Sequence, residues 1–288
     1  MICFPGKSRW RPAKRIHKKE LQNYLMQYES RCVTVTERIK NEGGRSPVTG
    51  RYLIYDGPSG IEGCLYYTAG GFVYPVFPEG ALPDRLGLRN ALSSLGPRLF
   101  CVMGTQRDVM NMEAVFSRPP VTCVSYYLME RQLPVAASHR PVDGAVRTRR
   151  AELSDAESIY PIQRLYELEE VLIDPAQFDP DVCMKQLRVS LKKQAVYIAT
   201  THAGIVAKAQ TNARGFGWDQ IGGVFTRESF RSRGIGKLVM RALLSETDRE
   251  ERRTSLFVKT HNAPALRMYR TLQYTTTDEF RITYYQNV

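Results

Sequence analysis

A basic, glycine-containing loop between a predicted strand and a predicted helix is the segment best suited to chemistry. Residues 231–236 have the sequence Arg-Ser-Arg-Gly-Ile-Gly. A loop of this kind turns several backbone N–H groups, together with the positive end of the helix dipole, towards one point. Arg231 and Arg233 add fixed positive charge beside it. The segment predicts a site for a phosphate-bearing ligand, although a solvated strand-to-helix turn would show the same pattern.

The spacing of this loop excludes two commoner phosphate-binding loops. A P-loop requires glycine, four further residues and then Gly-Lys-Ser/Thr, and the chain contains no such run. The dinucleotide fingerprint requires three glycines, whereas this loop has only Gly234 and Gly236. What remains is the pattern Arg-x-x-Gly-x-Gly.

A short helix predicted over residues 262–272 carries a second candidate pair, Asn262 and Tyr269. At about 100° per residue, a separation of seven positions leaves the two side chains within about 20° of each other. The small Ala265 between them leaves room for a ligand. Taken alone, Asn262 fits a helix N-cap and Tyr269 fits a core aromatic residue. Their order and spacing after the basic loop favour a joint role.

Together the two motifs resemble those of the GCN5-related N-acetyltransferases, with Arg-x-x-Gly-x-Gly followed by Asn-x-x-Ala-x-x-x-Tyr. The resemblance implies that acetyl-coenzyme A is the co-substrate and that a backbone N–H near Val224 or Phe225 stabilises the oxyanion. It implies that the pantetheine arm lies along Val224, Phe225 and Thr226. The remaining implied coenzyme contacts are Arg231, Ser232, Arg233, Gly234, Ile235, Gly236, Asn262 and Tyr269.

The resemblance also implies direct attack of a primary amine on the acetyl thioester, with Tyr269 protonating the departing thiolate. Glu169 and Glu170 are candidates for orienting the acceptor ammonium or for accepting its proton through water. A solvated helix end is the alternative explanation for both. The acceptor stays open between a protein N-terminus, a lysine and a small amine. A non-catalytic protein that binds or senses acyl-coenzyme A is the second functional hypothesis.

One position departs from the family pattern, because Leu-Gln-Tyr stands at 272–274 where Leu-Gly-Phe is usual. Glutamine at the glycine position predicts that the preceding helix ends without a left-handed cap.

The elements that must position these residues are predicted in the order of that family over residues 146–288. A capping box at Ser154 and Glu157 is expected to begin the first helix. The predicted elements are a strand at 146–151, helices at 154–170 and 181–193, strands at 195–200, 205–211 and 221–226, a helix from 235, a strand at 254–260, the helix at 262–272 and closing strands. The expected fold class is α/β (α+β), a mixed and mostly antiparallel sheet flanked by helices.

Residues 1–130 are predicted to form a smaller α/β domain, joined by a linker at 131–145 that contains two prolines and a glycine. Residues 63–76 together with Leu-Glu-Glu-Val at 168–171 resemble bacterial two-part acetyltransferases, whose first domain is a degenerate acetyltransferase-like unit. No Arg-x-x-Gly-x-Gly occurs in this half, so no second coenzyme site is expected. The predicted elements are a helix at 19–28, strands at 51–55, 63–68, 72–77 and 98–103, a capped helix at 105–116 and a strand at 121–129.

The net charge and composition of the chain limit the kinds of ligand and partner that are expected. The net charge of +12 suits a coenzyme with three phosphate groups and an acidic acceptor; nucleic acid is disfavoured because no recognised motif accompanies the charge. No apolar run approaches the length of a membrane span, and no signal-peptide core follows the N-terminal charges, so a cytoplasmic location is expected. Six dispersed cysteines and four histidines form no ligand pattern, so no metal is expected. A homodimer is left open.

Overall fold

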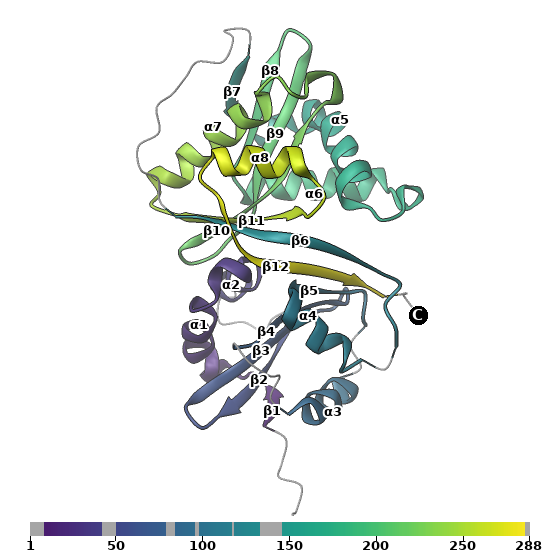
Figure 1. Cartoon of the computed structure of the whole chain (residues 1–288), viewed down its shortest axis with the longest axis vertical. Coiled ribbons are helices and arrows are strands. Elements are labelled where there is room, and N and C mark those ends of the chain that lie inside the picture. The colour runs from purple at the N-terminus through teal and green to yellow at the C-terminus, as the bar shows by residue number, and fades with distance from the viewer. Residues whose placement is uncertain are drawn as a thin grey trace, which may run out of the picture. The chain divides into compact units, whose positions relative to one another are not determined.

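The computed structural model describes residues 9–41, 50–78, 84–95, 98–116, 118–132 and 146–285. The chain divides into two compact units (Figure 1). Unit 1 comprises Met1–Leu128, Phe257–Asn262 and Thr276–Val288, and unit 2 comprises Met129–Leu256 and Ala263–Thr275. Most of the predicted linker, from residue 133 onwards, lies outside the described residues.

Unit 2 follows the predicted order of strands and helices. Strands β7, β8, β9 and β10 form an antiparallel series, and β11 is added to β10 in parallel. The elements are β7 (Arg147–Arg150), η3 (Leu153–Asp155), α5 (Ala156–Tyr166), the π-helical turn η4 (Glu167–Val171), η5 (Pro175–Gln177), α6 (Pro180–Lys193), β8 (Val196–Thr201), β9 (Gly204–Arg214), β10 (Trp218–Thr226), η6 (Glu228–Phe230), α7 (Ile235–Arg249), β11 (Arg253–Lys259) and α8 (Ala263–Thr271). Residues 257–259 at the end of β11 are grouped with unit 1.

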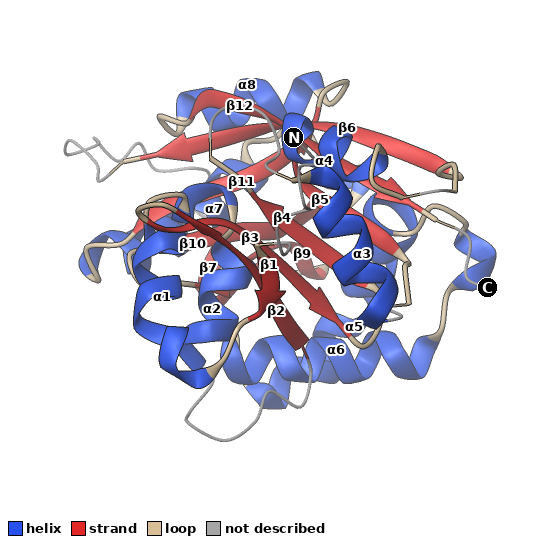
Figure 2. Ribbon diagram, turned by 90° about the horizontal axis from the view of Figure 1, so that it is seen from below, coloured by secondary structure: helices blue, strands red, loops and turns tan. Residues whose placement is uncertain are grey.

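Helices cover both faces of the unit 2 sheet. Ile159 of α5 and Leu187 of α6 are buried in one apolar cluster with Ile198 of β8, and the two helices lie side by side (Figure 2). Successive side chains of a strand point to opposite faces. Tyr197 therefore points the other way, where its hydroxyl donates a hydrogen bond of 2.9 Å to Glu246 of α7. Thus α5 and α6 cover one face, and α7 covers the other.

The start of α5 differs from its prediction. The capping box is formed by Glu152 and Asp155, and not by Ser154 and Glu157. The Asp155 carboxylate accepts a hydrogen bond of 2.8 Å from the backbone N–H of Glu152. It also accepts one of 2.7 Å from each terminal guanidinium nitrogen of Arg149. This ion pair with the preceding strand fixes the carboxylate at the start of the turn, so a short 3-10 helix precedes α5.

Unit 1 repeats the element order of unit 2, with two helices after the first strand and one helix on either side of the fifth. The sequence did not indicate β1, α2 or α3. The elements are β1 (Trp10–Pro12), η1 (Arg15–His17), α1 (Lys18–Met26), η2 (Glu29–Arg31), α2 (Val33–Asn41), β2 (Gly50–Gly57), β3 (Gly60–Thr68), β4 (Phe72–Val76), α3 (Arg85–Leu95), β5 (Cys101–Thr105), α4 (Gln106–Glu113) and β6 (Thr122–Arg131). Residues 129–131 at the end of β6 are grouped with unit 2.

The last strand of the chain, β12 (Thr275–Tyr284), lies in unit 1. It pairs antiparallel with β5, from Phe280 opposite Thr105 to Tyr284 opposite Cys101 (Figure 1). A sequential division of the chain would instead leave it with the C-terminal half. The difference arises because strand pairing depends on contacts between distant segments. The alternation of apolar and polar residues within a strand does not determine which strand it pairs with.

Candidate functional site

The centre of the candidate site is an irregular stretch at the end of β10. The parallel register with β11 runs from Trp218 to Ile221 and stops there in the described strands. On the other edge, the register with β9 shifts between Gly222 and Phe225, and Gly223 has a φ of 56°. The strand therefore bulges and parts from β11. On the β11 edge, residues 224–226 have no partner residue among the described strands of the sheet. Their backbone groups on that edge can therefore pair with a ligand.

Two glycines make this bulge possible because side chains of β9 fill the space beside them. A β-carbon at Gly222 would lie 2.0 Å from the Asn212 amide nitrogen, and one at Gly223 would lie 2.8 Å from Nζ of Lys208. Lys208 donates to Gln210 at 3.1 Å, and Gln210 donates to Asn212 at 3.2 Å. We call Lys208, Gln210 and Asn212 the polar row.

The polar row is not among the residues predicted from the sequence. Its signal is the alternation of Lys, Gln and Asn at every second position of a strand, which places all three side chains on one face. The neighbouring Gly-Gly pair supplies the room for them.

The predicted phosphate loop has the backbone shape of an anion site. Ser232 and Gly234 have positive φ angles of 61° and 77°, and residues 231–234 are exposed. Gly234 is the N-cap of α7 and provides no side-chain cap. The Leu238 N–H makes a helical bond to the Gly234 carbonyl, so the N–H groups of residues 235–237 precede the helical ladder. These donors suit a phosphate group.

Gly236 brings the loop close to the end of β10. A β-carbon there would lie 3.1 Å from the Thr226 hydroxyl oxygen and 3.5 Å from the Met268 sulfur of α8. The start of α7, the end of β10 and α8 therefore meet at one place. The predicted residues Val224, Phe225 and Thr226 lie on the strand that leads to it.

Glu169 is held by the phosphate loop. Its carboxylate accepts a hydrogen bond from Nη2 of Arg231 at 2.6 Å. The Nε of Arg231 also donates to the Thr226 carbonyl at 3.0 Å, and its guanidinium lies 5.3 Å from the centroid of the Phe225 ring. Both side chains are exposed to solvent, Glu169 at 43% and Arg231 at 45%. A competing anion can therefore reach the arginine.

Tyr269 is buried in α8 and packs edge-on against Tyr274, with 5.9 Å between ring centroids. Burial is the main reason why its pKa is raised, and the neighbouring Tyr274, Tyr166 and Glu170 add to the shift. Its hydroxyl is therefore protonated at neutral pH. Glu170 thus acts on Tyr269, whereas its neighbour Glu169 in η4 is bound to Arg231 of the loop.

The prediction about the end of α8 is wrong. Gln273 adopts a left-handed conformation with φ of 69°. The N–H of Tyr274 bonds to the Tyr269 carbonyl, and the N–H of Gln273 bonds to the Arg270 carbonyl, both at 3.1 Å. This is the Schellman pattern. Burial of Tyr274 and Leu272 favours the chain reversal even without glycine.

Asn262 lies immediately before α8 and is grouped with unit 1. Its N–H donates to the Lys259 carbonyl at 2.9 Å. All the other predicted site residues lie in unit 2.

Tyr166 is the last residue of α5, directly before the π-helical turn η4. Its hydroxyl accepts the backbone N–H of Gly223, and its ring lies 4.6 Å from Nζ of Lys208. Burial raises its pKa. Single π-helical turns often mark functional positions. Here the turn follows directly on the residue of α5 that contacts the bulge of β10.

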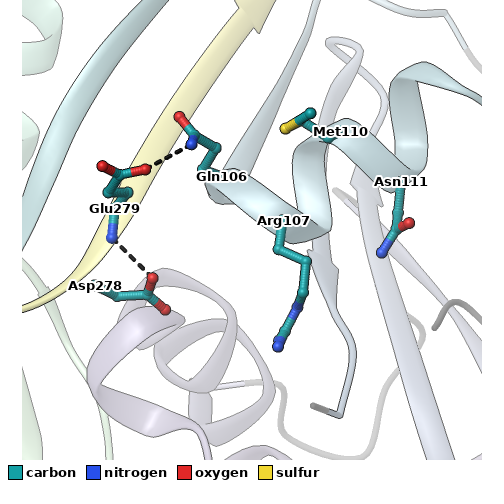
Figure 3. A pocket seen from close by; sticks show the side chains of 6 residues that line it. All are labelled: Gln106, Arg107, Met110, Asn111, Asp278 and Glu279. Atoms are coloured by element: carbon teal, nitrogen blue, oxygen red, sulfur yellow. Dashed lines mark hydrogen bonds between the residues drawn. The ribbon is translucent and has the colours of Figure 1, made fainter. Parts of the chain in front are cut away.

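Unit 1 has a separate open hollow of about 380 Å³ between α4 and β12 (Figure 3). Gln106 donates to the Glu279 carboxylate at 2.6 Å, and the Glu279 N–H bonds to Asp278. Two carboxylates beside a single Arg107 do not suit a phosphate group. None of the residues predicted from sequence lines this hollow, which is also lined by Met110 and Asn111.

Two classes of feature are missing from the described residues. No group of three or more histidine, cysteine, aspartate or glutamate side chains there is placed to hold a metal ion. Within the same part of the chain, no helix combines the length and apolar character that crossing a membrane requires.

Comparisons with known proteins bear on the fold of the chain. The family model of the FR47-like proteins matches residues 206–282, which hold the polar row, the bulge, the loop and α8. No curated protein sequence matches the chain significantly.

Solved structures match nearly the whole chain at low identity. A Drosophila protein superposes with a TM-score of 0.67 at 13% identity, covering 98% of this chain and 100% of its own. A GCN5-related N-acetyltransferase from Sphaerobacter thermophilus gives 0.62 at 14%, covering 97% and 96%. A tandem GNAT protein from the clavulanic acid biosynthesis pathway gives 0.57 at 12%, covering 95% and 97%.

The chain therefore has the GCN5-related N-acetyltransferase (GNAT) fold, in a two-unit arrangement that such tandem proteins also show. The resemblance and the fold class predicted from the sequence are confirmed: a mixed, mostly antiparallel sheet with flanking helices.

Proposed function

We propose that unit 2 transfers an acetyl group from acetyl-coenzyme A to a primary amine. The observation that carries this proposal is the parting of β10 from β11 after Ile221, next to the helix start at Gly234 that has no side-chain cap. Free backbone groups along a strand can hold an extended amide arm, and free N–H groups at a helix start can hold a diphosphate.

The residues present fit coenzyme A. The N–H groups of residues 235–237 and the exposed Arg231 and Arg233 would hold the diphosphate, and residues 224–226 would pair with the pantetheine arm. The coenzyme would supply an acetyl thioester, whose carbonyl is open to attack by an amine. Backbone N–H groups near Val224 and Phe225 would stabilise the oxyanion that develops.

Tyr269 would donate its proton to the leaving thiolate, because burial keeps its hydroxyl protonated. Glu170 acts electrostatically on both Tyr269 and Tyr166, and we infer that it would orient the acceptor ammonium. Glu169 would hold Arg231 in the absence of a diphosphate. A protein N-terminus, a lysine and a small amine all satisfy these requirements as acceptors.

Calorimetric titration with acetyl-coenzyme A tests the coenzyme site through a pair of matched variants. Gly234 and Gly204 both have positive φ, and a β-carbon at either would meet nothing within 4 Å. Both alanine variants therefore carry similar backbone strain. Gly234→Ala is expected to weaken acetyl-coenzyme A binding about tenfold, and Gly204→Ala to leave it unchanged. Equal effects, or no binding to the wild type, would refute the site.

Thiol release in the presence of pooled primary amines then tests the transfer itself. Turnover above the rate without amines is expected. Binding of acetyl-coenzyme A without turnover would instead support the non-catalytic acyl-coenzyme A binding or sensing protein.

A further inference from the structure

Lys208 of β9 is a buried amine that lies against the irregular segment of β10. It is 0% exposed, and its Nζ would lie 2.8 Å from a β-carbon on Gly223. Nζ donates one hydrogen bond, to Gln210 at 3.1 Å, and lies 4.6 Å from the centroid of the Tyr166 ring. The amine thus adjoins the backbone to which the proposed function assigns the thioester.

The surroundings of Lys208 favour its neutral form. Among the described residues, no carboxylate lies within ion-pairing distance of Nζ. The titratable groups that act on it are Glu167 of η4 and Cys183 of α6, beside the Tyr166 ring of α5. Burial of an unpaired charge is costly. Desolvation therefore lowers the pKa of Lys208 to about 7, against the smaller opposing effects of Glu167 and Cys183.

Glu167 does not neutralise the lysine directly. Its Oε1 accepts a hydrogen bond from the Gln163 amide at 2.8 Å. Burial raises the pKa of Glu167, and the bond from Gln163 and the charge of Lys208 partly offset that shift.

The sheet face on which Lys208 lies is otherwise apolar at this point. Lys208 is opposite Ile198 of β8 and Phe225 of β10. Both of these side chains are buried in the apolar cluster beneath α5 and α6. An aliphatic side chain would suit these neighbours, which leaves the lysine to be explained by chemistry.

We propose that Lys208 is the base that removes a proton from the acceptor ammonium, an inference that rests on the acetyl transfer proposed above. Neutral Nζ takes one proton, and the freed nitrogen lone pair forms the N–C bond to the acetyl carbonyl carbon. The C–S bond then breaks, and the second amine proton reaches the thiolate through Tyr269. Lys208 afterwards returns its proton to solvent, which leaves the protein as it began.

Tyr166 covers the amine in this arrangement. Its ring lies over Nζ, and its hydroxyl occupies the N–H of Gly223. An acceptor that reaches Lys208 must therefore displace the Tyr166 side chain, which would also release the Gly223 N–H for the thioester carbonyl.

The first test needs neither coenzyme nor acceptor. Lysine side chains of the full-length protein are labelled with ¹³C at the ε position and titrated by NMR, and the Lys208 signal is assigned by its loss in Lys208→Leu. A titration midpoint near 7 is expected. A midpoint near the ordinary 10.5 would overturn the proposal. This readout stays valid if acetyl-coenzyme A does not bind, so the two proposals can fail separately.

The second test uses Lys208→Leu and Lys208→Arg, with Lys192→Leu on the exposed face of α6 as the control. Acetyl-coenzyme A is the donor, and spermidine and free lysine are the acceptor probes. Both Lys208 variants are expected to lower kcat about 10²-fold with unchanged acetyl-coenzyme A affinity. Both should also lose the rise of kcat/KM with pH near 7 that the wild type shows with either acceptor. The control should behave as wild type.

Two results would overturn the assignment in this experiment. Restoration of the rate by arginine would identify a cationic anchor, because arginine cannot be deprotonated in this range. Acetylation of Lys208 in the intact mass spectrum without acceptor would identify a nucleophile.

Discussion

The two units share one order of elements but differ at the end of the fourth strand. In both units that strand leaves the fifth strand early: β4 pairs with β5 only at Phe72 and Val73, and β10 pairs with β11 only from Trp218 to Ile221. The difference lies on the other edge. β4 keeps a regular register with β3 from Val73 to Val76, whereas the register of β10 with β9 shifts between Gly222 and Phe225. The comparison shows that the parting of the fourth and fifth strands belongs to the fold, and that the bulge at the glycine pair is what unit 2 adds.

The starts of the following helices differ in the same sense. In unit 1, the Asp84 side chain accepts the N–H of Gly87 at 2.9 Å and so caps α3 with a carboxylate. In unit 2, Gly234 leaves the start of α7 without a side-chain cap. A carboxylate at a helix N-terminus occupies the position and repels the charge that a phosphate would bring. A diphosphate would therefore meet a carboxylate at the start of α3 and uncapped N–H groups at the start of α7.

Transferring the cap of unit 1 to unit 2 should have the largest effect. Gly234→Asp is expected to weaken acetyl-coenzyme A binding about 10²-fold, through competition for the free N–H groups and charge repulsion. Gly234→Asn is the matched control, since it has the same shape without the charge and tolerates positive φ. Calorimetry measures both variants. Equal losses for the two would show that shape, and not charge, closes the site.

Removal of the Tyr269 hydroxyl should affect turnover only. Tyr269→Phe is expected to lower kcat about 10²-fold while acetyl-coenzyme A affinity stays near the wild-type value. Steady-state kinetics beside a direct titration of the coenzyme checks this. Unchanged turnover would exclude Tyr269 from proton transfer.

Replacing the buried Lys208 with an apolar side chain should stabilise the free protein. The pKa of Lys208 in the folded state is lowered from 10.5 to about 7. The lysine therefore destabilises the folded state fully below pH 7, and this effect disappears as pH rises through 10.5. Lys208→Leu is therefore expected to raise the free energy of unfolding by about 2 kcal/mol at neutral pH, with the gain shrinking towards alkaline pH. Urea denaturation across this range measures it, and a gain independent of pH would contradict the lowered pKa.

The smallest expected effect concerns the end of α8. Gln273→Gly removes the cost of a left-handed glutamine and should stabilise unit 2 by about 0.5–1 kcal/mol, with little change in kcat. Thermal unfolding measures the shift, and Gln177→Gly in the exposed η5 turn serves as a control for glycine at a position outside this cap. Loss of stability in Gln273→Gly would show that the glutamine side chain makes a compensating contact.

The local motifs of the site could be predicted from the sequence because each is short and continuous. The loop at 231–236 and the helix of Tyr269 need only neighbouring residues for their identification. Lys208 could not be predicted in the same way, since its significance depends on Gly223, which lies opposite it on another strand. The placement of β12 beside β5 and the pairing of Glu169 with Arg231 likewise depend on contacts between distant segments.

The end of α8 shows a different limit of sequence reasoning. Gln273 has a poor intrinsic preference for a left-handed backbone, yet burial of Tyr274 outweighs that preference. The cost of one strained residue is about 1 kcal/mol, which is less than burial of an aromatic side chain contributes. Local conformational propensity therefore gives the wrong prediction where a tertiary contact contributes more free energy.

Hydrogen exchange of the full-length protein, with and without acetyl-coenzyme A, tests the difference between the two units most directly. Added coenzyme is expected to protect the backbone amides of residues 223–226 and 234–238 in unit 2, and to leave those of residues 72–76 and 84–88 in unit 1 unchanged. Protection of the unit 1 segments, or exchange in unit 2 that does not respond to the coenzyme, would contradict the account.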